Sequence, residues 1–478
     1  MAFLSIDFAI LFTFTFLLYS FSPVKARNYY LLTASCLFIA WNNLFFLVMS
    51  VLTTLFTFIA GQAIEKNQSN EKKTQAYYML SIVVLIGMWI LFHNASWLSS
   101  IISFFPIDKA HTSSIDQLIY PLGMSFYTFQ AIGYLTDVYW QEENAEKKIL
   151  DFSLYMLFFL KFLSGPIERY SSLIEQIRQP EAFNYENSVY GLKLIFLGMM
   201  KKLLIANYLS PYTTDIFSNI DNASGLQLLM TCLIYPLELY TDFSGYTDMA
   251  LGGARMFGLR LTPNFNFPFC SKSTADFWRR WHMSLSYWIR DYLFMPLTAT
   301  LRSWKTIGIY VSLLITFSLL GLWHGIGATF LIYGLIQGTL ICLEMRLSKV
   351  RTYVENRVGS KFASIVYIIR TYLLFAVSLI FFRANSLNDA IRFITHISFK
   401  PHLSWKEMNI GMSDHFCIVA GSALLLMLIY EHFSTRKDLI EESSKIPSWA
   451  RWSIYISLVF ALFSLGMFEN DNFIYLQF

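Results

Sequence analysis

The chain has 478 residues, of which 55% are hydrophobic and only 14% are charged, whereas soluble domains carry about 25% charged residues. A soluble core of this length cannot bury that much apolar surface, so a lipid bilayer must solvate a large part of it. The formal net charge of +4 gives no indication of nucleic-acid binding. The five cysteines show no CxxC spacing, which indicates neither a disulfide framework nor a zinc site.

Long apolar runs predict membrane-spanning helices rather than barrel strands, because barrel strands alternate over only about 10 residues. Two runs are too long for one crossing, and we expect each to form two helices: 29–61, broken near Trp41-Asn42-Asn43, and 306–343. The other candidate spans are 4–22, 76–93, 118–137, 149–165, 188–208, 223–240, 361–382, 414–432 and 449–467. Some of these segments are expected to be re-entrant rather than spanning.

Basic residues predict how the chain is oriented. The first Lys or Arg is Lys25, so we expect a retained first span rather than a cleaved signal peptide. Lys25 and Arg27 follow that span, and Lys66, Lys72 and Lys73 follow the next pair of helices. The positive-inside rule places both loops in the cytoplasm and the N-terminus outside. The polar stretches are too short for an appended domain, which predicts one membrane domain over residues 1–478.

Three carboxylates lie among apolar and small residues in 237–259, namely Glu238, Asp242 and Asp248. At helical spacing, such carboxylates could handle protons or bind a cation in a transporter. Alternatively, Asp242 and Asp248 could cap helix ends around the sequence FSGY, where Ser and Gly favour a turn. The residues favour capping.

The segment 273–297 is expected to be an amphipathic helix. Its aromatic stripe is made of Trp278, Trp281, Leu285, Trp288 and Tyr292, and its second stripe of Arg279, His282, Ser286 and Arg290. Such a helix belongs in the headgroup region, lying flat or dipping inward to line a polar cavity. Its arginines, including Arg280, could bind lipid phosphates or guide a phosphorylated substrate.

His324 interrupts a run of 38 residues, 306–343, that contains no formal charge. One interpretation is a polar residue near a membrane face, where Gly321, Gly325 and Gly327 allow the run to break. The other places His324 at depth, facing a cavity, where ionisable groups are usually functional. Its side chain can bind a proton near neutral pH, so it is the main candidate for chemistry.

The sequence DFWRRWHMSLSYWIRDYLFMPL, followed later by LLGLWHG, resembles the membrane-bound O-acyltransferase family. It is most similar to the bacterial branch of alginate O-acetylases and teichoic acid D-alanyl transfer proteins. Further matching pieces lie at 121–139, 164–170, 240–258, 264–269, 381–387 and 472–478. The resemblance covers nearly the whole chain in order.

This resemblance implies an all-α, polytopic helical bundle with a central funnel or tunnel and re-entrant helices. It also implies transfer of an acyl group from a thioester donor to a hydroxyl, with His324 as the signature histidine and His282 as the second. A histidine suits the task of general base. We assign substrate binding to Arg279, Arg280, Arg290, Trp281, Trp323, Asp242 and Ser244. We expect no metal and no bound cofactor.

The implied donor is acetyl-CoA or another acyl thioester, and the implied acceptor is a cell-envelope polysaccharide. An extracytoplasmic acetyltransferase partner could complete the transfer. The expected location is the bacterial cytoplasmic (inner) membrane, in contact with lipid and without nucleic acid. Two alternatives stay open: D-alanyl transfer from a carrier-protein thioester toward teichoic acid, and a proton-coupled transporter using His324, Glu238 and Asp242.

Overall fold

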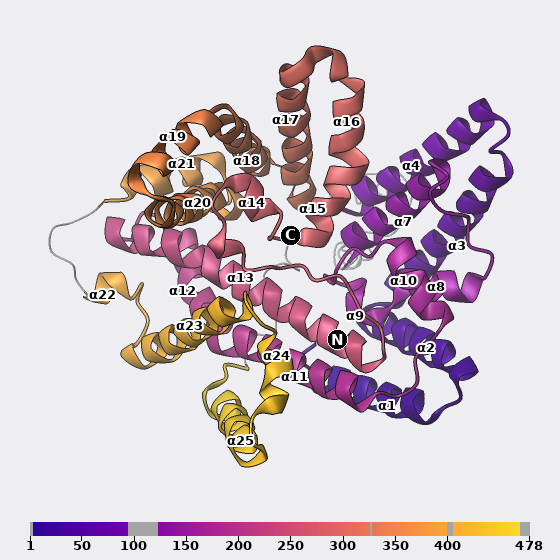
Figure 1. The fold of residues 1–478 in the computed structure, drawn as a ribbon, viewed down its shortest axis with the longest axis horizontal. Coiled ribbons are helices and arrows are strands. Elements are labelled where there is room, and N and C mark those ends of the chain that lie inside the picture. Colours follow the sequence, from indigo (N-terminus) through magenta and orange to yellow (C-terminus); the bar gives the residue numbers. More distant parts are fainter. Residues whose placement is uncertain (1–2, 94–122, 326, 399–404, 469–478) are drawn as a thin grey trace, which may run out of the picture. The chain divides into compact units, whose positions relative to one another are not determined.

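In the computed structural model, residues 3–93, 123–325, 327–398 and 405–468 are described, and every regular element in them is a helix (Figure 1). The chain folds into two compact units, one made of Met1–Ile195 and Met249–Thr262, the other of Phe196–Asp248 and Pro263–Phe478. The predicted all-α fold is therefore confirmed. The single domain, the funnel and the re-entrant helices stay predictions.

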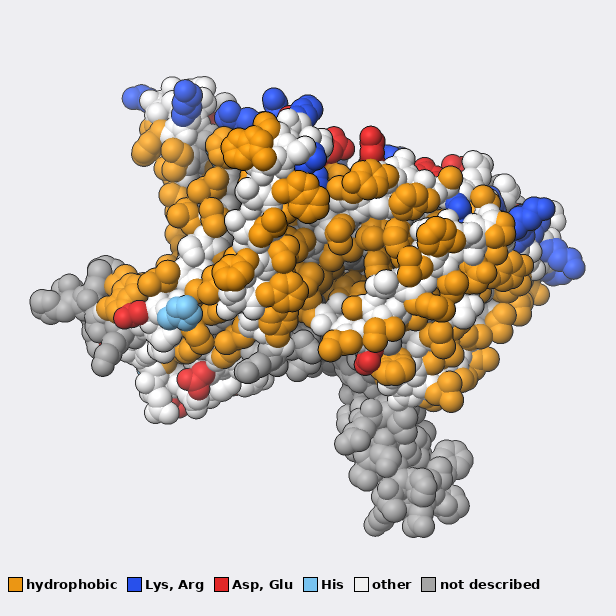
Figure 2. All heavy atoms as spheres, turned by 90° about the horizontal axis from the view of Figure 1, so that it is seen from below, with side chains coloured by type: hydrophobic (Ala, Val, Ile, Leu, Met, Phe, Trp, Pro, Cys, Tyr) orange, Lys and Arg blue, Asp and Glu red, His pale blue; other side chains and the backbone are white. Residues whose placement is uncertain are grey.

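Seven helices of the described residues are long and apolar enough to cross a membrane. They are α3 (Leu44–Lys66), α4 (Glu71–His93), α17 (Lys305–His324), α18 (Ala328–Arg346), α20 (Ser360–Arg383), α23 (Asp414–Ser434) and α25 (Ser448–Leu465). Figure 2 shows hydrophobic side chains over most of the face drawn. The chain is thus a multi-pass membrane protein, as its composition predicts.

The first unit is built mainly from consecutive helices. Besides α3 and α4, these are α1 (Ile6–Phe21), α2 (Val24–Asn42), α7 (Met124–Tyr139), α8 (Ile149–Leu157), α9 (Phe159–Phe162), α10 (Tyr170–Arg178) and the first part of α11 (Tyr185–Lys201). The predicted break near 41–43 is confirmed. Asn43 is extended between α2 and α3, and its side chain accepts a hydrogen bond from the backbone nitrogen of Phe45 at 2.8 Å. This is an N-cap, which ends one helix pattern and starts the next.

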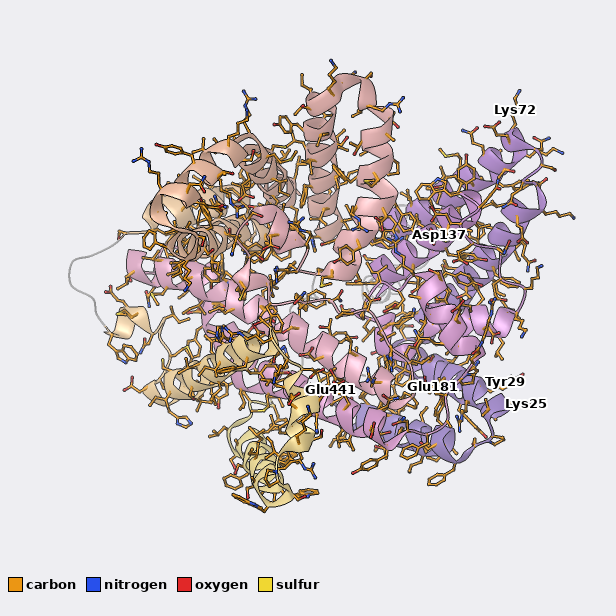
Figure 3. All side chains as sticks on the ribbon, viewed as in Figure 1. Lys25, Tyr29, Lys72, Asp137, Glu181 and Glu441 are labelled. Atoms are coloured by element: carbon orange, nitrogen blue, oxygen red, sulfur yellow. The ribbon has the colours of Figure 1, made fainter. Side chains whose placement is uncertain are left out.

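The basic residues used for orientation differ in their surroundings. Lys25 is exposed on α2, and Lys72 extends outward from the first turn of α4 (Figure 3). Arg27, by contrast, is buried over the ring of Tyr19 at 5.1 Å and donates to the backbone oxygen of Glu181. Arg27 therefore stabilises the first unit as well as adding to the charge of its loop.

The prediction of one span over 149–165 is wrong. Phe158 interrupts the helix, so α8 has nine residues and α9 only four. Phe152, Phe158 and Phe159 are fully buried, which shows that the apolar sequence here fills a protein core rather than facing lipid. The predicted span 118–137 begins outside the described residues, and α7 forms the remainder.

A buried carboxylate fixes the loop before α8. Burial acts to raise the pKa of Glu146, but hydrogen bonds from backbone amides, Tyr170 and Arg178 outweigh it and hold that pKa below its ordinary value. The Tyr170 hydroxyl donates at 2.7 Å, and the Glu146 amide itself donates to the Tyr134 hydroxyl at 2.9 Å. One acidic residue thus connects the loop to α7 and α10.

The second unit contains the remaining helices. They include a π-helical turn η1 (Lys202–Ala206), α12 (Asn207–Ser218), α13 (Gly225–Met256) as far as Asp248, η2 (Pro268–Cys270), α14 (Thr274–Trp278), α15 (Met283–Ile289), a second π-helical turn η3 (Arg290–Phe294), α16 (Met295–Thr300), η4 (Arg302–Trp304), α19 (Ser348–Val358), α21 (Leu387–His396), α22 (Trp405–Met408), α24 (Leu439–Glu442) and η5 (Ser443–Lys445). The predicted division of 306–343 into two helices is confirmed, because α17 ends at His324 and α18 starts at Ala328.

The predicted turn at FSGY is wrong, because α13 runs unbroken for 32 residues through Asp242 and Asp248. Lys202 Nζ donates to Asp242 Oδ1 at 2.6 Å, and Lys201 Nζ donates to Asp248 Oδ2 at 2.8 Å. The Lys202 and Asp242 side chains are 2% and 0% exposed. A carboxylate that has a buried cation as its partner is satisfied in mid-helix and does not need a helix end.

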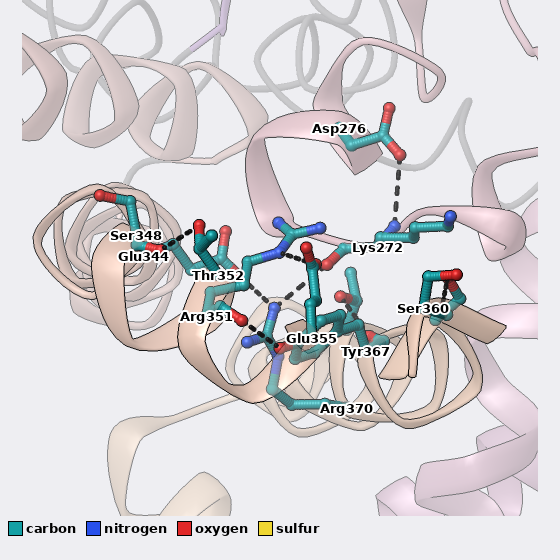
Figure 4. A network of polar contacts seen from close by, with 12 residues as sticks. Lys272, Asp276, Glu344, Ser348, Arg351, Thr352, Glu355, Ser360, Tyr367 and Arg370 are labelled. Atoms are coloured by element: carbon teal, nitrogen blue, oxygen red, sulfur yellow. Dashed lines mark hydrogen bonds and ion pairs between the residues drawn. The ribbon is translucent and has the colours of Figure 1, made fainter. Parts of the chain in front are cut away.

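A polar network anchors the start of α14 (Figure 4). Glu344 of α18 accepts from Arg370 Nη2 of α20 at 2.7 Å and from the backbone nitrogen of Thr274 at 2.8 Å. In the neighbouring α19, Arg351 pairs with Glu355 at 3.0 Å. The network therefore joins α14 to two membrane helices just upstream of His282.

We predict that Lys202→Met destabilises the protein by about 3–5 kcal/mol, because it leaves Asp242 as an unpaired buried charge. The measurement is the thermal unfolding midpoint in detergent. Lys445→Met is the matched control, because Lys445 and Glu442 form an exposed pair and its loss should leave the midpoint unchanged. Equal midpoints for the wild type and Lys202→Met would contradict the conclusion that Lys202 stabilises the buried charge of Asp242.

Candidate functional site

The expected continuous helix over 273–297 is wrong, because the chain turns sharply at His282. This residue has φ 45° and ψ 54°, between the end of α14 and the start of α15. Few residues other than glycine adopt this left-handed conformation, so surrounding contacts must impose it. The Met283 amide donates to the backbone oxygen of Asn264 at 2.9 Å, and Ser284 donates to the Asn264 side chain.

The turn places His282 in an aromatic enclosure that also holds His324. His282 is 1% exposed and meets the ring of Phe243, from α13, at a centroid distance of 4.8 Å. Trp323 lies 6.4 Å from His282 and 4.7 Å from His324. Phe382, from α20, covers His324 at 5.1 Å. Two histidines 42 positions apart in the sequence thus share one indole ring.

His324 combines features of both sequence interpretations. It ends α17, and Gly325 continues in extended backbone, so the expected break at the glycines is real. The side chain is nevertheless buried, at 6% exposure, as expected for a functional residue at depth. The depth of His324 in a bilayer stays a prediction.

The electrostatics of the enclosure favour a neutral imidazole. Burial lowers the pKa of His282 well below its ordinary value, and a charge on His324 lowers it further. A neutral imidazole has one ring nitrogen able to accept a proton. A hydroxyl group that reaches the enclosure can therefore donate a hydrogen bond to a neutral imidazole. Among the described residues, no group of three or more His, Cys, Asp or Glu side chains could hold a metal ion.

The predicted cationic stripe is wrong, because Arg290 and His282 do not share an exposed helix face. Arg290 lies in the π-helical turn η3, where it pairs with Asp291 at 2.6 Å and its side chain is 55% exposed. Arg280 pairs with Asp276 at 3.0 Å, while Arg279 follows the last residue of α14. Substrate binding by these three arginines stays a prediction.

Trp281 belongs to an aromatic cluster. Its ring stacks on Phe277 at 5.4 Å and lies 5.2 Å from Phe375. This cluster packs the chain immediately before His282. Trp323, in contrast, touches both histidines directly and is the better placed of the two predicted tryptophans.

Two further predicted residues, Asp242 and Ser244, flank Phe243 on α13 and are both buried. Asp242 forms the ion pair with Lys202, so it holds α13 in place. Ser244 contacts Tyr240, the residue one turn earlier. Their placement next to Phe243 connects them to the histidine enclosure, and substrate binding by Asp242 and Ser244 stays a prediction.

Sequence reasoning missed Lys202 and Asn264. For Lys202, a signal was available: two adjacent lysines inside the apolar segment 188–208 require buried partners. Asn264 carried no such signal, because its partners Met283 and Ser284 are 19 and 20 positions away in the sequence. A contact of this kind becomes visible only when the chain is folded.

The first unit holds another missed residue, Lys161 in α9. Lys161 is buried, its Nζ donates to Gln130 Oε1 at 2.6 Å, and burial lowers the pKa of Lys161 to about 7. It lines a small pocket together with aromatic residues that include Phe126 and Tyr127. The preceding apolar run concealed this residue within an expected span.

The chain is thus an all-helical, multi-pass membrane protein that encloses a buried pair of histidines. Comparison with known proteins identifies the family to which this membrane protein belongs. The pattern of the membrane-bound O-acyltransferase family matches residues 143–383, which contain both histidines. The chain belongs to this family and is an O-acyltransferase, as the sequence resemblance predicted.

Three relatives illustrate the similarity. A probable alginate O-acetylase of Azotobacter vinelandii is 34% identical over 82% of this chain and 77% of its own length. A peptidoglycan O-acetyltransferase of Helicobacter pylori is 26% identical over 98% of both chains. A teichoic acid D-alanyltransferase of Bacillus subtilis is 34% identical over 47% of this chain and 58% of its own length.

We predict that Gly334→Ala lowers acyl transfer at least about tenfold by moving α17, and His324 with it. A Cβ at Gly334 would lie 2.1 Å from the backbone oxygen of Phe317 on α17, a contact that the two helices can relieve only by separating. Transfer activity at matched protein levels is the measurement.

The control is Gly421→Ala in α23, where an added Cβ meets nothing within 4 Å. Activity of Gly334→Ala equal to that of Gly421→Ala would show that the close packing of α17 and α18 does not position His324.

Proposed function

We propose that the protein transfers an acetyl group from acetyl-CoA, or another acyl thioester, to hydroxyls of a cell-envelope polysaccharide, with His324 as general base. The observation that carries this proposal is the buried enclosure in which Trp323 contacts both His282 and His324. Relatives named as alginate and peptidoglycan O-acetyltransferases support the acetyl group and the polysaccharide acceptor.

In the proposed reaction, the acceptor hydroxyl oxygen attacks the thioester carbonyl carbon while His324 takes the hydroxyl proton. The new C–O bond forms, the C–S bond breaks, and the proton passes from the imidazolium to the departing thiolate. The products are an ester and a free thiol. A thioester needs little activation, so one positioned base and a few hydrogen-bond donors are sufficient. In this proposal His282, which also contacts Trp323, orients the reacting groups.

The two ends of α17 differ in charge, which supports a reaction between a donor on one side of the membrane and an acceptor on the other. The helix has 20 residues, so it is about 30 Å long, close to the thickness of a bilayer core. It begins beside Arg302 and Lys305 and ends at His324. The positive-inside rule places the basic end in the cytoplasm, which leaves His324 toward the side where envelope polymers lie.

The same rule supports the inner membrane as the location, with the N-terminus outside, because the exposed Lys25 and Lys72 mark cytoplasmic loops. In this orientation Arg279, Arg280 and Arg290 hold the donor phosphates. An extracytoplasmic acetyltransferase partner receives the acetyl group if the acceptor polymer cannot enter the site itself.

D-alanyl transfer from a carrier-protein thioester is the second candidate, and the Bacillus subtilis relative favours it. The chemistry at His324 would be identical, so the transferred acyl group decides between the two. A proton-coupled transporter has less support. Asp242 is committed to Lys202, and Glu238 accepts from Thr213 Oγ1 at 2.6 Å, contacts that stabilise the helix bundle.

We predict that His324→Ala abolishes ester-linked acetate on envelope polysaccharide while the protein still inserts and folds, because burial lowers the pKa of His282 and leaves it too weak a base to replace His324. Mild alkaline release of acetate from cells with no copy, the wild type or the variant measures this. His415→Ala is the matched control, because His415 is exposed, and it should retain wild-type acetate.

Ester-linked D-alanine in place of acetate would favour the second candidate. Unchanged acetate in cells that express His324→Ala would overturn the role of His324.

A further inference from the structure

The turn that carries His282 is held by a second segment of the chain, residues 264–266. The backbone nitrogen of Asn266 donates to the oxygen of Arg280 at 3.0 Å, and the backbone nitrogen of Met283 donates to the oxygen of Asn264 at 2.9 Å. These two bonds lie on either side of His282. They fix both ends of the turn, but they leave the conformation of His282 itself to be determined by side-chain contacts.

The Asn264 side chain supplies those contacts. Its Oδ1 accepts from the Ser284 backbone nitrogen at 3.2 Å and from Ser284 Oγ at 2.6 Å. Two donors to the same atom identify it as the oxygen of the amide. Asn264 is 1% exposed, so these bonds form without competition from bulk solvent. The side chain thereby caps the first turn of α15 from outside that helix.

The other end of the turn is anchored independently. Trp278 Nε1 donates to Gln337 Oε1 at 3.0 Å, and Gln337 Nε2 donates to Ser378 Oγ at 2.7 Å. This buried chain fixes α14 against α18 and α20. The four residues between the two anchors are therefore 279–282, and His282 adjoins the Asn264 anchor.

We call the two hydrogen bonds from Ser284 to Asn264 Oδ1 the clamp, and the amide nitrogen of Asn264 takes no part in it. Asn264 Nδ2 is buried and meets no acceptor within the described residues. Buried donors in folded proteins nearly always have a partner, and an exception calls for an explanation such as a bound ligand. An apolar residue of similar size could not accept the two bonds from Ser284, so the turn itself requires an amide at this position.

We propose that Asn264 is a positioning residue of the transfer site: its side-chain oxygen holds His282 in the left-handed conformation that directs the imidazole toward Trp323 and His324. This inference rests on the proposed role of His282 in the reaction. A left-handed residue other than glycine persists only where its surroundings over-determine it. Without the clamp, His282 relaxes toward an ordinary conformation and leaves the enclosure.

The test uses the full-length protein in lipid nanodiscs, with thiol release from acetyl-CoA in the presence of envelope polysaccharide as the readout. We expect Asn264→Ala to lower kcat at least about tenfold with KM little changed, because misplacing a group by about 1 Å can cost a hundredfold. Ser284→Ala is the matched control. It removes one hydroxyl but keeps the backbone donor, and we expect a loss below about threefold.

A double-mutant cycle separates positioning from general damage. If Asn264 acts through His282, then Asn264→Ala should cost less than about twofold when it is added to His282→Ala. The same fold loss in both backgrounds would overturn the proposal, as would wild-type kcat for Asn264→Ala. Wild-type kcat for His282→Ala would overturn both this inference and the proposed role of His282.

Hydrogen exchange gives a readout that does not depend on turnover. Asn264→Ala should speed exchange in peptides that cover 278–289 and leave 305–324 unchanged, because only the turn is released. Faster exchange in both regions would mean a general loss of structure and would overturn the proposal. A wild-type protein that releases no thiol would overturn the proposed function, while the exchange result would still decide whether Asn264 holds the turn.

Discussion

The buried ion pair between Lys202 and Asp242 is the constraint on which the second unit depends. Neither charge can be left alone in an apolar interior, because an unpaired buried charge is strongly destabilising. The pair at 2.6 Å therefore fixes α13 against the π-helical turn that follows α11. The next residue on α13 is Phe243, which packs on His282. An electrostatic requirement thus sets the position of one wall of the histidine enclosure.

The other walls come from two interruptions of helical structure, each with its own cause. The run between Lys305 and Glu344 is too long for one crossing, and it breaks after His324 at a glycine. The break at His282 has no such sequence cause, because the hydrogen bonds that Asn264 Oδ1 accepts from Ser284 join residues 20 positions apart. The enclosure therefore joins one histidine placed by chain length with another placed by distant contacts. Both histidines lie beside Trp323.

A break caused by segment length can be predicted from the sequence, whereas a break caused by distant contacts cannot. Segment length and hydrophobicity correctly predicted the break at Asn43 and the α17–α18 pair, and the rarity of charge pointed to His324. Hydrophobicity does not distinguish lipid-facing from buried residues, so it predicts a span around Phe158, where the chain is buried in the protein. Periodicity suggested one helix through His282, because partners such as Asn264 lie outside the window that any periodicity covers. Ser and Gly in FSGY predict a turn with Asp242 as a cap, because the partner that keeps Asp242 in mid-helix, Lys202, lies 40 positions away.

The proposed role of His324 as the base of an acyl transfer inside this enclosure is tested most directly with the purified protein in liposomes. Acetyl-CoA with a labelled acetyl group is supplied together with an envelope polysaccharide, and labelled ester and free thiol are counted. We expect one thiol released for each ester formed by the wild type, and neither product from His324→Ala. Thiol and ester formed by His324→Ala at the wild-type rate would contradict it.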